Sequence, residues 1–166
     1  MSENKNESNT GCTYCTFDVG NLHCGIPASE IQEVIRAQST TRVPLAPSSV
    51  KGLINLRGQI VVAIDLRECL GLPKRDSDES LMNVVIRTPD GLVSLLVDRI
   101  DDVVDVTRKQ IETTPKTLSD QLQKFVTGAV QLNRNLLLII DAKATIEAAM
   151  SQTQETILLA PVHSHE

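Results

Sequence analysis

The side chains best suited to chemistry lie near the start of the chain. Cys12 and Cys15 have the Cys-x-x-Cys spacing of zinc sites and thiol–disulfide enzymes, and His23 and Cys24 follow closely. A Gly-Asn turn at 20–21 would pair the flanking segments as a β-hairpin. Strand alternation then predicts a core face made of Cys15, Phe17, Val19, Leu22, Cys24 and Ile26. The opposite face, which we expect to be solvated, is made of Tyr14, Thr16, Asp18 and His23. The candidate zinc ligands are split across the sheet, which favours structural cysteines.

Other catalytic patterns are missing from the sequence. A thioredoxin-like site needs its Cys-x-x-Cys at the start of a helix, and no helical pattern follows Cys15. Serine, histidine and acidic residues show no nucleophile spacing, and no glycine-rich phosphate loop is present. The sequence therefore predicts no enzymatic activity, no cofactor and no metal.

Composition narrows the class of protein. The 166 residues carry 16 basic and 21 acidic side chains, a formal net charge of −5, and only 2% aromatic residues. An acidic chain poor in aromatic residues is unlike a nucleic-acid-binding protein. No apolar run approaches the ~18 residues of a membrane span, and the start, MSENKNESNTG, lacks the apolar core of a signal peptide. We expect a cytoplasmic protein with reduced thiols and no membrane insertion.

The chain contains an internal duplication. Residues 50–65 (VKGLINLRGQIVVAID) align without a gap on residues 126–141 (VTGAVQLNRNLLLIID), at an offset of 76. Each copy ends in an aspartate followed by a short helical pattern, so Asp65 and Asp141 are predicted helix caps. A second hairpin signal, Asp90-Gly91, mirrors the first one at 20–21.

The duplication predicts two similar β-rich halves within a single domain, 12–150. We expect the first β-subdomain at about 12–72 and the second at about 80–150, partly intertwined and joined by a solvated connection at 74–80. About five short strands per half favour small β-barrels, which leave no exposed edge. The ends are expected to be a disordered leader, 1–11, and a flexible tail, 151–166.

One arginine stands inside the apolar stretch GLINLRGQIVVAIDL (52–66). Alternation along a continuous strand places Ile54, Leu56, Ile60, Val62 and Ile64 on the core face. Asn55, Arg57 and Gln59 share the opposite, polar face. Gly58 occupies a core position, which suggests a β-bulge or a close backbone approach. Arg57 is either a solvated arginine or a recognition group, since arginine is favoured at protein interfaces.

The stretch GLINLRG followed by IVVAIDL resembles the signature of the CheW family of bacterial chemotaxis coupling proteins. The similarity extends through GIPASEIQEVI (25–35), VDRIDDVV (97–104), FVTG (125–128) and LLLIID (136–141), and covers about 13–150. It implies a mainly β fold of two intertwined five-stranded SH3-like barrels with short helices. It also implies a non-enzymatic scaffold that binds the regulatory domain of the histidine kinase CheA and the cytoplasmic tip of methyl-accepting chemoreceptors.

The resemblance further implies a receptor-binding groove where the two barrels meet. Its residues, carried over by motif, are Ile31, Glu33, Gly52, Asn55, Arg57, Val84, Val85 and Val103. Apolar positions there would accept a helical receptor tip, while Arg57 and Glu33 would fix its register. The kinase would be met through contacts at the barrel ends, and the protein would be recruited to membrane-associated receptor arrays.

Two other readings stay open. The same adaptor could serve a non-flagellar chemosensory pathway that controls pili, gliding or gene expression. A thiol- or metal-responsive β-barrel could instead use Cys12, Cys15 and Cys24. The cysteines at Cys12 and Cys15 stand where the family usually has large apolar residues, which keeps this reading in view.

Overall fold

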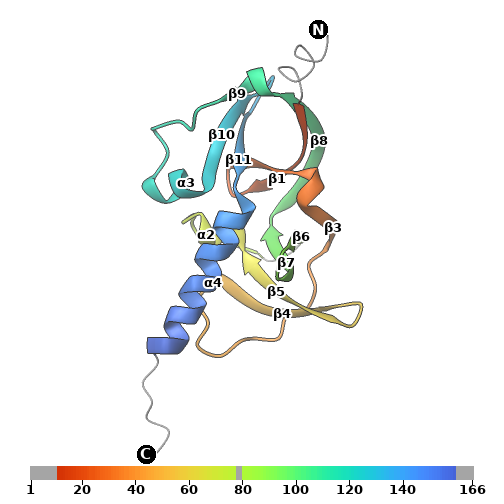
Figure 1. The fold of residues 1–166 in the computed structure, drawn as a ribbon, viewed down its shortest axis with the longest axis vertical. Coiled ribbons are helices and arrows are strands. Elements are labelled where there is room, and N and C mark those ends of the chain that lie inside the picture. Colours follow the sequence, from red (N-terminus) through yellow and green to blue (C-terminus); the bar gives the residue numbers. More distant parts are fainter. Residues whose placement is uncertain (1–10, 78–79, 160–166) are drawn as a thin grey trace, which may run out of the picture.

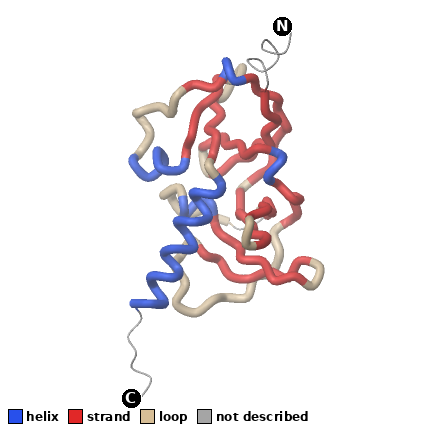
Figure 2. Tube along the Cα trace, in the orientation of Figure 1, coloured by secondary structure: helices blue, strands red, loops and turns tan. Residues whose placement is uncertain are grey.

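The computed structural model describes residues 11–77 and 80–159 (Figure 1). The predicted leader therefore lies outside the described residues except for Gly11, which begins the first strand. Strands dominate the chain (Figure 2), so the prediction of a mainly β protein is confirmed.

The strands form two sheets. The six-stranded sheet has the order β8-β1-β2-β11-β10-β9 and the five-stranded sheet the order β3-β6-β7-β5-β4. The strands of the first are β1 (Gly11–Val19), β2 (Leu22–Pro27), β8 (Arg99–Thr107), β9 (Ile111–Glu112), β10 (Val126–Gln131) and β11 (Leu136–Ile140). Those of the second are β3 (Ile31–Arg36), β4 (Val50–Leu56), β5 (Gln59–Asp65), β6 (Met82–Thr88) and β7 (Gly91–Val97). Each sheet therefore takes strands from both sides of the connection at 74–80.

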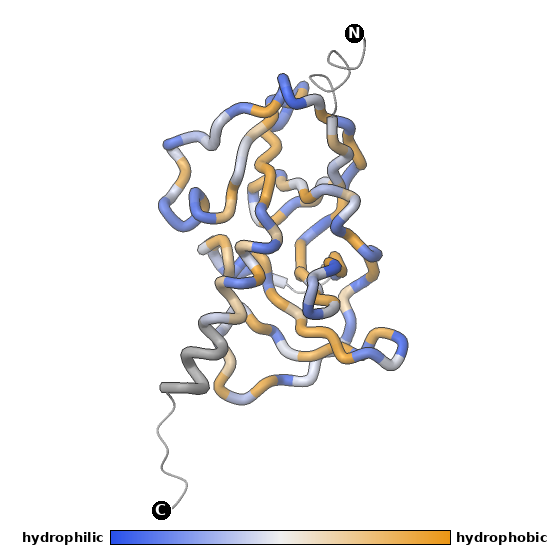
Figure 3. Tube along the Cα trace, viewed as in Figure 1, coloured by the Kyte–Doolittle hydropathy of each residue, from blue (hydrophilic) through white to orange (hydrophobic). Residues whose placement is uncertain are grey.

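The buried apolar residues form three clusters. The largest lies between the two sheets and includes Phe17, Cys24, Ile64, Leu95 and Ile140. Each sheet also curls around a smaller cluster of its own, and Figure 3 shows apolar residues along most strands with polar residues at the tip of the β4–β5 hairpin. Burial of this aliphatic surface is the main force that stabilises the fold.

The face of β1 that we expected to be solvated is partly buried. Tyr14 is 6% exposed and packs with Val106, Val130 and Leu137 inside the curled six-stranded sheet, and Thr16 is 1% exposed. That expectation was wrong because the sheet curls back over its second face, which alternation along one strand does not reveal. The core positions of Cys15 and Cys24 are confirmed.

The expected continuous strand through Gly58 is instead a hairpin. Leu56 pairs with Gln59, which leaves Arg57 and Gly58 as a two-residue turn with φ values of 52° and 86°. Two positive φ angles are typical of the type I′ turn, whose twist suits a β-hairpin. Gly58 does not form a β-bulge, and no other part of the chain packs closely against it, since an added Cβ there would meet nothing within 4 Å.

The turn reverses the faces of the residues that follow it. Ile54 and Leu56 are buried as expected, and Ile64 is buried on the opposite face, in the cluster between the sheets. Ile60 is 62% exposed and Val62 is half-buried. Val61 and Ala63 occupy the core instead. A change of one residue in register moves each side chain of a strand to the other face.

Three α-helices complete the fold: α2 (Leu66–Cys69), α3 (Asp120–Phe125) and α4 (Ala142–Leu159). Both predicted caps are confirmed, because Asp65 Oδ1 accepts the Arg67 N–H at 3.0 Å and Asp141 Oδ1 accepts the Ala144 N–H at 3.0 Å. Helix α4 continues past Ser151, so the predicted tail starts inside this helix, and residues 160–166 lie outside the described ones. Among the helices of the described chain, none combines the length and hydropathy that crossing a membrane requires.

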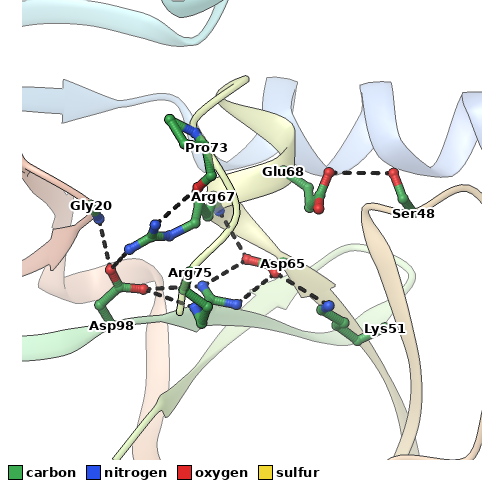
Figure 4. Close-up of polar contacts among 9 residues, drawn as sticks. All are labelled: Gly20, Ser48, Lys51, Asp65, Arg67, Glu68, Pro73, Arg75 and Asp98. Atoms are coloured by element: carbon green, nitrogen blue, oxygen red, sulfur yellow. Dashed lines mark hydrogen bonds and ion pairs between the residues drawn. The ribbon is translucent and has the colours of Figure 1, made fainter. Parts of the chain in front are cut away.

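A network of ion pairs connects the two sheets (Figure 4). Asp98, between β7 and β8, accepts hydrogen bonds from the Gly20 N–H at 2.7 Å and from the guanidinium groups of Arg67 and Arg75. Arg75 also donates to Asp65 at 2.8 and 3.0 Å. The connection that carries Arg75 is thereby fixed to the β1–β2 turn of one sheet and to the end of β5 in the other.

Candidate protein-interaction site

An exposed ion pair lies beside the β4–β5 turn. Arg57 Nη1 and Nη2 donate to the two carboxylate oxygens of Glu33 at 2.6 and 2.7 Å, the fork-on-fork geometry that arginine favours. The side chain of Arg57 is 73% exposed and that of Glu33 is 20% exposed. The hydrogen bond from Arg57 holds the pKa of Glu33 below its usual range, so the carboxylate is ionised near neutral pH.

The same ion pair connects opposite edges of one sheet. Glu33 lies on β3 and Arg57 follows β4, which are the two outermost strands in the order of the five-stranded sheet. Their contact shows that this sheet curls until its edges approach one another. The ion pair therefore lies where the two edges of the sheet meet, and the curl of all five strands is needed to bring Glu33 and Arg57 together.

Asn55 and Ile60 extend this surface. The Asn55 Oδ1 accepts the Gly58 N–H at 2.8 Å, which ties the side chain to the turn that carries Arg57. Ile60 lies directly opposite Asn55 in the strand pairing and is exposed. Opposed residues of an antiparallel pair project from the same face. Ile60 was not predicted as a site residue, although reading Arg57-Gly58 as a turn would have placed it there.

Three of the carried-over residues lie beneath the surface. Val84 and Val85 are completely buried, one between the sheets and one inside the five-stranded sheet. Gly52 is buried with φ +146°, and a Cβ there would lie 2.3 Å from the Thr41 carbonyl oxygen. Leu53 and Thr41 exchange two backbone hydrogen bonds of 2.8 Å at this point. These three residues can influence a partner only through the positions of the strands that carry them.

Val103 and Ile31 lie outside the Arg57 hairpin. Val103 is 63% exposed on β8, an edge strand of the six-stranded sheet. Ile31 is half-buried at the start of β3 and packs against the core between the sheets. In Figure 1 both β8 and β3 lie on the side of the molecule away from α4. The structure thus brings together Glu33, Asn55 and Arg57, and places an exposed valine on the other sheet.

The cysteines do not gather into a metal site. Cys15, Cys24 and Cys69 are buried and Cys12 is half-buried, and all four are free thiols. Burial raises the pKa of Cys24 to about 12 and that of Cys69 to about 12, so neither forms a reactive thiolate near neutral pH. Within residues 11–77 and 80–159, the one group of three possible metal ligands is Asp18, His23 and Asp101, which contains no cysteine.

Comparison with known proteins places the chain among chemotaxis proteins. Residues 13–150 match the family model described as the CheW-like domain. The chain is 31% identical to "Chemotaxis protein CheW" of Bacillus subtilis, with 89% of this chain and 94% of that protein covered. It is 29% identical to "Chemotaxis protein CheW" of Klebsiella aerogenes, with 93% and 91% covered.

A solved structure has the same fold. The crystal structure of the scaffolding protein TtCheW from Thermoanaerobacter tengcongensis superposes with a TM-score of 0.72 at 25% sequence identity. The match covers 80% of this chain and 90% of that one. Nearly the whole length of these proteins is therefore shared with the chain.

Proposed function

The chain belongs to the CheW-like family, and from that premise we propose that it couples methyl-accepting chemoreceptors to a CheA-type histidine kinase. It acts in the cytoplasm as a non-enzymatic adaptor of chemotaxis signal transduction. Its relatives are named as chemotaxis and scaffolding proteins, which supports a role in assembly.

The observation that carries this proposal is the Arg57–Glu33 pair at the turn of the β4–β5 hairpin. A bidentate ion pair with one strongly exposed guanidinium presents charge in a fixed geometry to a docking surface. Ile60 and Val103 add exposed apolar contact area. Helical segments dock through apolar anchors, and charged groups at the rim fix register and exclude wrong partners.

We assign different roles to the eight candidate residues. Glu33, Asn55, Arg57 and Val103 contact the receptor tip directly, with the half-buried Ile31 at the edge of the contact. Gly52, Val84 and Val85 position the strands beneath it. The kinase binds at the ends of the curled sheets, so that both partners are held at once.

Co-sedimentation with the kinase and receptor fragments from the same genome tests this function. The wild-type chain should join both partners into one complex. Arg57→Glu should keep the kinase and lose the receptor, because it replaces the exposed cation by an anion next to Glu33. Its unfolding midpoint should stay close to that of the wild type, since exposed ion pairs contribute little to stability.

Two further variants sharpen the test. Arg134→Glu reverses an exposed charge in the corresponding segment of the second copy, at the position that aligns with Gly58, and should leave both interactions intact. The exchange Glu33→Arg/Arg57→Glu keeps an ion pair but swaps its charges, so receptor binding should remain lost. Restored binding in the exchange variant would mean that the pair only holds the fold. Failure of the wild type to bind either partner would reject the adaptor function itself.

A further inference from the structure

A cavity opens beside the ion-pair network, at the end of the β4–β5 hairpin opposite the Arg57 turn. Its volume is about 520 Å³, within the range of small-molecule sites. The walls come from three segments: the loop between β3 and β4 with the start of β4, the end of β5 with α2, and the connection after α2 (Figure 4). Apolar side chains such as Val43 and Val50 share the lining with Thr40 and Ser48.

The cavity is strongly basic in an acidic protein. Five cationic side chains line it, and two carboxylates, Asp65 and Glu68, are the only anionic ones among its lining residues. The cations are Arg42, Lys51, Arg67, Lys74 and Arg75. The local excess of three positive charges, five minus two, contrasts with the net charge of −5 for the chain. Cations concentrated in a concave, partly apolar site attract anions far more than the same charges spread over a surface.

Part of this positive charge has no counter-ion among residues 11–77 and 80–159. Arg67 and Arg75 are paired with Asp98 and Asp65, and Lys51 reaches Asp65 only at 3.6 Å. Arg42 and Lys74 form neither an ion pair nor a side-chain hydrogen bond with any described residue. The Nε–H of Arg67, buried in the same wall, lacks an acceptor within the described part of the chain. Three cations are therefore available to a ligand: Arg42 on the loop before β4, Lys51 on β4, and Lys74 on the connection after α2.

We propose that this cavity binds a small, multiply charged anion of the phosphate type. Lysine binds phosphate as a point charge and arginine as a fork, and both kinds of group are unengaged here. The hydroxyl groups of Thr40 and Ser48 can donate to further phosphate oxygens. A concave site of this volume, with cations on three neighbouring segments, suits a compact anion that several of them can contact at once.

Binding would add a link between the loop before β4 and the connection after α2. Arg42 lies on the loop between β3 and β4, whereas Lys74 lies on the connection that also holds Arg75. An anion held by both would fasten the loop to the network that joins the two sheets. The ligand would accordingly stabilise the fold, because anything that binds only the folded state raises its unfolding midpoint.

A titration with inorganic pyrophosphate, followed by amide NMR spectra of the full chain at constant ionic strength, tests the proposal. We expect saturable shifts at residues 40–51 and 74–75 and a higher unfolding midpoint. Arg42→Ala/Lys74→Ala should weaken binding at least about tenfold, a loss of about 1.4 kcal/mol, while the ligand-free midpoint stays unchanged. Lys109→Ala, which removes an exposed cation between β8 and β9 that does not line the cavity, should bind like the wild type.

Three results would overturn the proposal. Shifts of the same size in sodium chloride would show general ion screening. Equal affinity of the wild type and Arg42→Ala/Lys74→Ala would place the anion elsewhere. Saturable binding of a poly-glutamate peptide, with no binding of pyrophosphate, would make the cavity part of a protein-docking surface.

Discussion

At the scale of single residues, environment decides which reactive groups can act. Nothing in the sequence distinguishes Cys24 and Cys69 from other cysteines. In the fold, burial raises the pKa of both thiols, so they are hard to ionise. Burial likewise raises the pKa of Cys15, while Cys12 remains half-buried on the outer part of β1. These four similar side chains should differ sharply in reactivity.

Thiol labelling of the native protein should modify Cys12 alone. The reagent attacks thiolates that it can reach, and only Cys12 is partly accessible. Mass spectrometry of the mildly alkaline reaction should show one label quickly and four after unfolding. Cys12→Ser serves as the control and should take up no label while folded. Rapid labelling of Cys24 would show that the core between the sheets opens readily. If the purified protein contained one zinc ion per chain, and this zinc protected several thiols from the reagent, the result would favour a metal-responsive β-barrel instead.

At the scale of elements, the β4–β5 hairpin shows how a local turn sets the faces of a strand. The two-residue turn at Arg57-Gly58 places Val61 inside the curled sheet and Ile60 outside it. Neighbouring aliphatic residues therefore have opposite roles, although a continuous strand would have assigned them the other way around.

Alanine substitutions at these two positions should separate the roles. Val61→Ala should lower the free energy of unfolding by about 1–3 kcal/mol, because it removes buried methyl groups and leaves a cavity. Ile60→Ala deletes a larger side chain but should change stability by no more than ~0.5 kcal/mol, since the residue is exposed. Denaturant unfolding measures both. The reverse ranking would show that the register of β5 is that of a continuous strand.

The hairpin also shows what the sequence could and could not predict. Alternation before the turn was reliable, and Asp65 and Asp141 were recognised as caps because capping is a local interaction. Tyr14 was misplaced because its burial depends on β8, β10 and β11 folding around β1. The pairing of Glu33 with Arg57 likewise required knowing that the outer strands of a sheet meet. Contacts made by sheet curvature have no signature in a single segment.

At the scale of the whole molecule, Asp98 is a point of connection between the sheets. Partial burial alone would raise the pKa of this carboxyl, but hydrogen bonds from Arg67, the Gly20 N–H and Arg75 outweigh it and lower the pKa below the ordinary aspartate value. A lowered pKa in the folded state means that the ionised form stabilises the fold above the ordinary aspartate pKa. This contribution is lost as pH falls through the folded-state pKa.

Asp98→Asn should therefore be less stable than the wild type at neutral pH, by about 1–3 kcal/mol for losing charged hydrogen bonds. The difference should shrink as the pH falls, because protonation neutralises the wild-type carboxylate as well. Thermal unfolding across the acidic range measures this convergence. Asp90→Asn, at an exposed turn, is the control and should be as stable as the wild type at neutral pH. A difference that is independent of pH would show that Asp98 acts through shape alone.

Each sheet contains strands from both halves of the chain, and this affects how the protein folds during synthesis. Strand β1 cannot be completed on its outer side until β8 has been synthesised, and β2 pairs in parallel with β11, more than a hundred residues later. During translation the outer edges of the early hairpins therefore stay unpaired, and an N-terminal fragment ending near residue 77 could complete neither sheet. Two copies of such a half could satisfy one another only by exchanging strands. The duplicated chain is thus built as a strand-swapped pair joined into one polypeptide, for which the connection at 74–80 serves as the join.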